Sequence, residues 1–270
     1  LPTEKINLKK KIIERMFSLT NINYQKLLDE YEIKRKELNL PNAKLVFLSF
    51  LLSKLSNFDM SYKIIINGYE RIGKSTLALI IAYYYNIFKF NYINIDSFVK
   101  QNIFFNVDKP IELQKENIYI FDEASLISDK RLSMMLKQIN LIKTFRINAY
   151  LNNVFLILSQ DFTDLDIRLI NSSNMLIHLY KRGLGFVYIF KQNITSTKRD
   201  FIESFRQIND LSNEKIQMRK LKQLSPFIFS FRFKDISIEN YNEELNAVNL
   251  LYKDVKQFKL KEINNKLDFF

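Results

Sequence analysis

The chain has 270 residues, a net charge of +12 and 47% hydrophobic side chains, a content that supports a folded core and excludes a disordered chain. It contains no cysteine, which excludes a disulfide scaffold and thiolate metal sites. The single histidine, His178, lies in an apolar run, so we expect a packed or edge residue and no histidine-based metal site.

The positive charge is distributed unevenly along the chain. Residues 1–60 carry a net charge of +4, residues 61–180 carry +2 and residues 181–270 carry +6. Basic flanks predict a polyanionic partner such as nucleic acid, although a solvated basic face is the alternative. High use of Asn, Ile, Lys and Phe indicates an AT-rich coding bias, which accounts for part of the lysine excess. No run of 18 apolar residues occurs, so we expect no membrane span.

The first 59 residues are predicted to form a helical appendage. Apolar spacing predicts three helices, at about 8–17, 24–38 and 45–55. Asn21 and Asn23 are candidate caps for the second helix, Pro41 interrupts the chain before the third, and Asn42 is the candidate cap of the third. No motif in this region carries chemistry, so packing against the rest of the chain is its simplest role.

A phosphate-binding loop signature follows. A β-branched run at 63–67 predicts a buried strand before the loop, and a helical pattern at 76–86 follows it. The loop matches G-x-x-x-x-G-K-[ST] and holds two of the four glycines in the chain. A strand-to-helix turn that matches by chance is the alternative. We expect a nucleotide to be bound by Gly68, Tyr69, Glu70, Arg71, Ile72, Gly73, Lys74, Ser75 and Thr76.

Individual residues of this loop have distinct expected roles. Successive backbone N–H groups and the helix N-terminus surround phosphate oxygens from several sides. The Lys74 ammonium is expected to reach the β- and γ-phosphates of ATP, and the Ser75 hydroxyl is expected to ligate Mg²⁺. The Glu70 side chain must point away from the phosphates because both groups are negative. ATP is favoured over GTP because no N-K-x-D motif follows.

The second motif is a strand that ends in two acidic residues. Before it we predict a strand at 91–95, a helix at 97–105 and a loop at 108–116. Residues 117–121 are largely apolar and are followed by Asp122 and Glu123, 48 positions after Lys74, as in a Walker B strand. Asp122 is expected to hold the Mg²⁺ shell through water, and Glu123 to act as the general base for the attacking water. An ordinary strand end with an acidic turn is the alternative.

A third strand end carries a polar residue. A long helix is predicted at 130–151, and an apolar strand at 153–158 leads to Gln160. The carboxyl ends of parallel strands line a bound nucleotide in such sheets, so Gln160 is expected to sense the γ-phosphate or to orient the water. A strand-ending turn without chemistry is the alternative.

The remaining elements complete an α/β domain and lead into a basic extension. We predict a helix at 163–170, strands at 175–180 and 186–191 around a glycine turn, helices at 198–210 and 213–224, and a strand or extended arm at 226–233. Ser237 can cap a last helix whose apolar stripe either packs or contacts another subunit: Tyr241, Leu245, Val248, Leu251, Val255 and Phe258. The predicted domains are a helical appendage at 1–59, an α/β core at 60–192 and a mainly helical extension at 193–270.

Residues 60–190 resemble the FtsK–HerA type of P-loop ATPase and its viral, phage and plasmid relatives, including zonula-occludens-toxin-like proteins. The resemblance rests on the GYERIGKST loop, the IYIFDEAS strand and the segment from Val154 to Gly183. It implies an α/β P-loop fold of the additional-strand, catalytic-glutamate class, with a mostly parallel sheet. It also implies an oligomeric ATPase, with Mg²⁺, that moves or packages DNA. Such motors use an arginine from a neighbouring subunit, for which Arg146 and Arg168 are the candidates.

Other functions remain open at this point. The leading hypothesis is a DNA motor, virus- or plasmid-encoded, in the host cytoplasm or associated with the virion. An AAA+-like replication initiator or helicase loader shares both motifs, but no clear lid motif follows residue 198. A nucleotide kinase is disfavoured because its strands rarely end in Asp-Glu. A nucleotide-gated virion assembly or secretion factor with slow hydrolysis is the alternative from a different class. Either arginine could instead be a surface residue or a salt-bridge partner.

Overall fold

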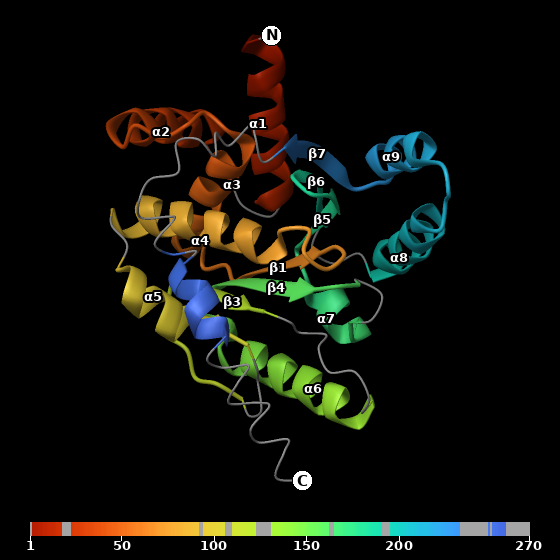
Figure 1. Cartoon of the computed structure of the whole chain (residues 1–270). Helices are drawn as coiled ribbons and strands as arrows, with labels where there is room; N and C mark the ends of the chain where they lie inside the picture. Colours follow the sequence, from red (N-terminus) through yellow and green to blue (C-terminus); the bar gives the residue numbers. More distant parts are fainter. Residues whose placement is uncertain are drawn as a thin grey trace.

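The computed structural model describes residues 2–17, 23–91, 94–105, 110–122, 131–161, 165–190, 195–232, 248 and 250–257. Within them, seven strands form one sheet in the order β2-β3-β4-β1-β5-β6-β7 (Figure 1). The strands are β1 (Tyr62–Asn67), β2 (Ile103–Phe104), β3 (Ile118–Phe121), β4 (Val154–Ser159), β5 (Met175–Lys181), β6 (Leu184–Ile189) and β7 (Phe227–Arg232).

The sheet is mixed but mostly parallel. β2, β3, β4, β1 and β5 pair in parallel, whereas β6 pairs antiparallel with β5, and β7 pairs antiparallel with β6. The expected α/β class with a mostly parallel sheet is therefore confirmed. Since β4 lies between β1 and β3, the strand that precedes the glycine loop and the strand that precedes Asp122 are not direct neighbours.

Helices cover both faces of the sheet. They are α1 (Pro2–Met16), α2 (Tyr24–Glu37), α3 (Lys44–Ser53), α4 (Lys74–Phe90), α5 (Ile95–Asn102), α6 (Arg131–Ile147), α7 (Ile167–Ser172), α8 (Thr195–Asn209) and α9 (Glu214–Gln223). Side chains of a strand alternate between faces, and the two packed clusters follow that alternation: Ile64 and Ile66 meet α1–α5, whereas Ile65 meets α6–α9. In Figure 1, α1–α4 lie above the sheet and α6 and α7 below it.

The three predicted N-terminal helices form and pack on the sheet domain. Residues 45–53 of α3 are buried, and Tyr31 of α2 packs its ring on those of Phe47 and Phe88. Each such buried side chain contributes about 1.5–3 kcal/mol. Asn23 caps α2 by accepting a hydrogen bond from the Lys26 N–H at 3.1 Å. The proposed cap Asn42 is wrong, because Ala43 is the N-cap of α3 and makes no side-chain bond; Asn21 lies outside the described residues.

The strand predicted at 91–95 is wrong at the described residues, since Asn91, Asn94 and Ile95 are not in a strand; residues 92 and 93 lie outside the described ranges. Helix α4 extends to Phe90, and Asn91 closes it in the left-handed conformation at φ 61°. Asn94 then caps α5, since its side chain accepts a hydrogen bond from the Ser97 N–H at 3.0 Å. Two asparagines therefore stop one helix and start another, and these local hydrogen bonds outweigh the alternating pattern of a short segment.

The C-terminal part contributes to the same sheet and core. Helices α8 and α9 form as predicted, and the segment predicted as a strand or extended arm is β7 at the sheet edge. Residues 248 and 250–257, called here the C-terminal helical segment, are helical, and Val248 and Tyr252 are buried in the cluster that contains α4. Of the two alternatives for its apolar stripe, packing within the chain rather than contact with another subunit therefore holds for this segment. Ser237, Tyr241, Leu245 and Phe258 lie outside the described residues.

Among the helices of the described ranges, none has the length and apolarity needed to cross a membrane.

Candidate functional site

Residues 68–76, called here the lysine loop, connect β1 to α4 through backbone conformations that favour glycine. The φ angles of Gly68, Arg71 and Gly73 are 149°, 58° and 105°. A Cβ atom on Gly68 would lie 2.7 Å from the Leu179 carbonyl oxygen of β5, so a side chain at this position is excluded on steric grounds as well. The lysine loop therefore lies directly against the neighbouring strand.

The N-terminus of α4 presents backbone N–H groups without a side-chain cap. Gly73 is its N-cap, no side chain caps it, and its first turn contains no acidic residue. The first N–H groups of a helix lack intrahelical partners and carry a partial positive charge. The uncapped start of α4 and the Lys74 ammonium are thus neighbouring hydrogen-bond donors in the lysine loop.

The Lys74 side chain folds back over the lysine loop. Its ammonium donates hydrogen bonds to the carbonyl oxygens of Gly68 at 2.6 Å and Tyr69 at 2.9 Å. The Tyr69 side chain is 73% exposed, Arg71 is exposed and Ile72 is buried. The lysine is therefore held at the loop, with carbonyl oxygens in the place where phosphate oxygens are expected.

Asp122 lies opposite the start of α4. It directly follows β3. Because side chains of a strand alternate between the two faces, Asp122 lies on the same face as Ile118 and Ile120, which is the face covered by α4. Its backbone N–H donates to the Phe104 carbonyl oxygen of β2 at 2.8 Å. The Ser75 hydroxyl donates to Asp122 Oδ2 at 3.4 Å. The structure therefore brings together the two residues predicted to serve Mg²⁺.

Two side chains of the C-terminal helical segment also contact Asp122. The Tyr252 hydroxyl donates to Asp122 Oδ2, and Lys256 Nζ lies 3.1 Å from the same oxygen. The Asp122 side chain is 2% exposed and that of Lys256 is 25% exposed. The sequence predicted the apolar face of this segment but contained no signal for where it packs, because these residues follow Asp122 by 130 and 134 positions.

Gln160 reaches the lysine loop from β4. Its amide donates to the Glu70 carboxylate at 3.1 Å, so the loop carboxylate points at the strand end rather than into the loop. Next to it, the Ser159 hydroxyl donates to the Asp161 carbonyl oxygen at 2.6 Å. Gln160 thus lies at the same edge of the sheet as Lys74 and Asp122. Glu123, the proposed general base, lies outside the described residues.

The two candidate arginines lie on separate helices, Arg168 on α7 and Arg146 on α6. Arg168 is near the start of α7, and its guanidinium binds both oxygens of Asp166, at 2.9 and 2.7 Å, which holds the pKa of that carboxyl below its ordinary value. Arg146 is exposed in the last turn of α6, close to Ala149, whose carbonyl accepts a hydrogen bond from Ser61 at the beginning of β1. A six-residue strand spans about 20 Å, so Arg146 is far from the lysine loop of its own chain.

His178 is a packed residue, as one of the sequence alternatives has it. Its Nδ1 lies 3.1 Å from Asn67 Oδ1, and its ring meets that of Phe205 at 4.9 Å. Burial lowers the pKa of His178 to about 4, so the neutral form prevails near pH 7. Its Nε2 has no hydrogen-bond partner among the residues that the structure describes.

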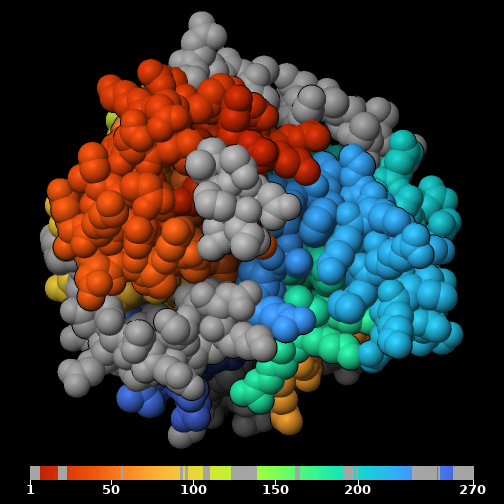
Figure 2. Space-filling model, turned by 90° about the horizontal axis from the view of Figure 1, so that it is seen from above, coloured from red at the N-terminus to blue at the C-terminus, as the bar shows by residue number. Residues whose placement is uncertain are grey.

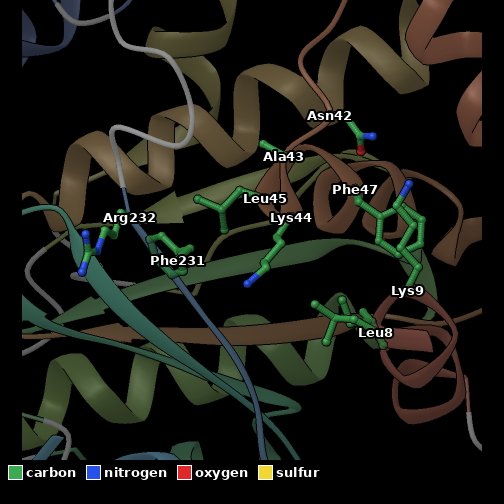
Figure 3. Close-up of a pocket in the computed structure, with 10 residues that line it drawn as sticks. Leu8, Lys9, Asn42, Ala43, Lys44, Leu45, Phe47, Phe231 and Arg232 are labelled. Carbon is green, nitrogen blue, oxygen red and sulfur yellow. The ribbon is translucent and has the colours of Figure 1, made fainter. Parts of the chain in front are cut away.

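A separate pocket of about 250 Å³ lies between α1, the start of α3 and the end of β7 (Figure 3). Its lining is mostly apolar, with Lys9, Lys44 and Arg232 as its charged members. Lys44 donates to the Ser230 carbonyl oxygen at 3.0 Å, and Lys9 binds Glu32 at 2.6 Å. None of its lining residues belongs to a predicted motif, so the pocket adds nothing to the lysine-loop site.

Within the described ranges, no three His, Cys, Asp or Glu side chains are grouped as a metal site. Mg²⁺ does not require such a group, because it keeps several waters and is usually bound by one or two protein ligands plus substrate phosphates. Ser75 and Asp122 fit that pattern.

Comparison with known proteins identifies no relative: no family model, curated protein or solved structure matches the chain.

Proposed function

We propose that this chain is a P-loop ATPase that binds ATP with Mg²⁺, hydrolyses it, and acts on DNA as part of a homo-oligomer. The observation that carries the proposal is the 3.4 Å contact between Ser75 and Asp122. A hydroxyl that follows a loop lysine and a carboxylate from a distant strand are the pair that holds Mg²⁺ in such enzymes. Lys74 lies at the neighbouring position, as phosphate binding requires.

The lysine loop fits the triphosphate of ATP. Gly68 and Gly73 provide space and the left-handed backbone, and the start of α4 offers N–H groups without a side-chain cap. The Lys74 ammonium now bonds to two loop carbonyl oxygens and would bond to phosphate oxygens instead when ATP is present. When bound, Mg²⁺ would neutralise phosphate charge between Ser75 and Asp122.

The order of the strands supports the additional-strand class. In that class a further strand separates the strand of the phosphate loop from the strand of the acidic motif, and β4 has that place between β1 and β3. Gln160 at the end of β4 is therefore the candidate to sense the γ-phosphate. Its hydrogen bond to Glu70 must open before its amide can turn toward a phosphate.

Glu123 is proposed as the general base from its place directly after Asp122. A neighbouring subunit would add an arginine, and Arg168 and Arg146, both exposed, are the candidates. The guanidinium of Arg168 is bound to Asp166, so Arg168 would exchange that carboxylate for a γ-phosphate at a subunit interface. Arg146 lies near the start of β1, at the end opposite the lysine loop, so it would act only on the nucleotide of a neighbour.

Helix α9 is the proposed DNA contact. It carries Lys215, Arg219, Lys220 and Lys222 against the single acid Glu214, and all four cations are exposed. In the described part of the chain, none of the four forms an ion pair, whereas Glu214 binds Lys181 at 2.5 Å. Lys215, Arg219 and Lys222 follow an i, i+4, i+7 spacing along about 10 Å of one helix face. Figure 2 shows α8 and α9, in teal and light blue, on the side of the molecule away from the N-terminal helices.

Turnover of ATP tests the proposal. We expect DNA to raise the rate several-fold in the native chain, and Glu123→Gln to bind ATP without turnover. Glu203→Gln, at an exposed position of α8, is the matched control and should behave as the native chain. A native chain that binds no ATP would contradict the proposal.

A second function is favoured by the contacts of Tyr252 and Lys256 with Asp122, which leave the acidic motif occupied. A nucleotide-gated assembly or secretion factor would hydrolyse ATP slowly while Tyr252 and Lys256 bind Asp122. Slow turnover that does not respond to single- or double-stranded DNA would favour that function over the motor.

A further inference from the structure

The C-terminal helical segment binds Asp122 through two of its side chains. Tyr252 and Lys256 are four residues apart in a helix, so their side chains lie on one face and reach the same oxygen. Val248 is buried on that face, and the Tyr252 ring lies 5.6 Å from the Phe105 ring. On the outer face, Leu250 and Lys253 are exposed.

The hydrogen-bonding capacity of Asp122 Oδ2 is fully used. A carboxylate oxygen has about two lone-pair sites, and this one receives the Ser75 hydroxyl, the Tyr252 hydroxyl and the Lys256 ammonium. A metal ion bound between Ser75 and Asp122, directly or through water, needs a lone pair of this same oxygen. The Ser75 hydroxyl can turn a lone pair to the metal and keep its proton toward Asp122, so Tyr252 and Lys256 are the two donors that must leave.

Repulsion between charges adds to this competition for the lone pairs of Asp122. Lys256 places one positive charge 3.1 Å from an oxygen that is almost fully buried. A divalent cation beside Asp122 would lie within a few ångströms of that ammonium, where repulsion between like charges is weakly screened.

From these contacts we propose that Lys256 and Tyr252 compete with Mg²⁺ for Asp122, so that docking of the C-terminal helical segment and binding of metal-loaded nucleotide oppose each other. The proposal rests on the proposed ATP site and gives it a regulatory element within the same chain. Lys256 and Tyr252 leave Asp122 when the site is loaded, and coupling is reciprocal, so whatever holds the segment away raises the affinity for metal-bound nucleotide.

The opposite role for Lys256 is a cation that binds the γ-phosphate directly. The two roles predict opposite changes. If Lys256 binds phosphate, its loss weakens nucleotide binding with or without metal. If it competes with metal, its loss strengthens binding only when Mg²⁺ is present.

The test measures the dissociation constant of a fluorescent ATP analogue in Mg²⁺ and in EDTA. The readout is the dissociation constant in EDTA divided by that in Mg²⁺, so a larger ratio means a larger advantage from the metal. We expect Lys256→Gln to increase the advantage given by Mg²⁺ about tenfold, within the range usual for coupled sites. Tyr252→Phe keeps the ring and should increase it less. Lys253→Gln, on the outer face of the same helix, is the matched control and should leave the ratio unchanged.

Hydrogen exchange of the native chain provides a second readout. Amides of residues 250–257 should exchange faster with ATP and Mg²⁺ than with ATP and EDTA. An unchanged or smaller ratio in Lys256→Gln, or equal exchange in both buffers, overturns this proposal and leaves the ATP site standing. If the native chain binds nucleotide in neither buffer, the proposed function fails and this proposal fails with it.

Discussion

The two halves of the sheet differ in how they use their strand ends. In the parallel half, β1, β4 and β3 all end at one edge, and the lysine loop contacts Asp122 and Gln160 there although they come from three separate parts of the sequence. In the antiparallel half, β5, β6 and β7 alternate in direction, so their ends are divided between both edges. The parallel arrangement brings the predicted site residues to one edge of the sheet. The antiparallel strands instead pack against α8 and α9, and α9 carries the exposed cations.

The largest expected effect lies in the parallel half. Lys74→Ala should lower the ATPase rate about 10²–10³-fold, as is usual when a group that stabilises transition-state charge is removed. The measurement is steady-state turnover, with thermal unfolding as a check on folding. Lys100→Ala, an exposed lysine of α5, is the control. Equal rates in Lys74→Ala and the native chain would show that the lysine loop is not the site of hydrolysis.

The next effect belongs to the antiparallel half. Replacement of Lys215, Arg219 and Lys222 by Gln should make the slope of log K against log salt for duplex DNA shallower by about 3, since each phosphate contact contributes about 0.9. The binding assay is run without nucleotide, so it does not depend on the ATPase. Three exposed lysines of the N-terminal helices, Lys11, Lys26 and Lys36, changed to Gln, serve as the control. A similar change of slope in both triple variants would mean that α9 has no special role.

A third prediction concerns β5, where the two halves meet. The pKa of His178 is about 4 in the folded chain against 6.5 as its ordinary value, so the unfolded chain binds more protons between these values. Stability should therefore fall on acidification below pH 6.5, by about 2 kcal/mol between pH 7 and pH 5. Urea unfolding of the native chain and of His178→Gln measures the difference. If the stability of the native chain and that of His178→Gln depend on pH in the same way, the lowered pKa of His178 is contradicted.

The smallest expected effect is at Gln160. Gln160→Ala removes one neutral hydrogen-bonding group, which contributes about 0.5–1.5 kcal/mol, so turnover should fall up to about tenfold with ATP binding unchanged. Gln207→Ala, an exposed residue of α8, is the control. A loss of ATP binding equal to the loss of turnover would indicate that Gln160 acts on the ground state and not on the γ-phosphate.

Much of the parallel half could be predicted from the sequence because its signals are local. The glycine spacing, the apolar run before Asp122 and the strand before Gln160 each depend on neighbouring residues, and parallel pairing then brings the strand ends together. Around 91–95 the short apolar pattern predicts a strand, whereas the caps at Asn91 and Asn94 end one helix and begin another.

The contacts that the sequence could not reveal are the long-range ones. Tyr252 and Lys256 meet Asp122 across more than a hundred residues, and no pattern near either end of that contact encodes the other. The pairing of Glu70 with Gln160 is of the same kind, since it links residues 90 positions apart. Such contacts arise from how whole elements pack and not from local propensity.

The close approach at Gly68 has a mechanical consequence. With no side chain between the loop backbone and Leu179, there is nothing to absorb a displacement, so the lysine loop and β5 must shift together. β5 is in turn attached to α9, through Lys181 to Glu214 at 2.5 Å and through the Tyr180 hydroxyl to Gln217 at 2.7 Å. If the motor proposal holds, the last three residues of β5, 179–181, link the nucleotide loop directly to the DNA-facing helix.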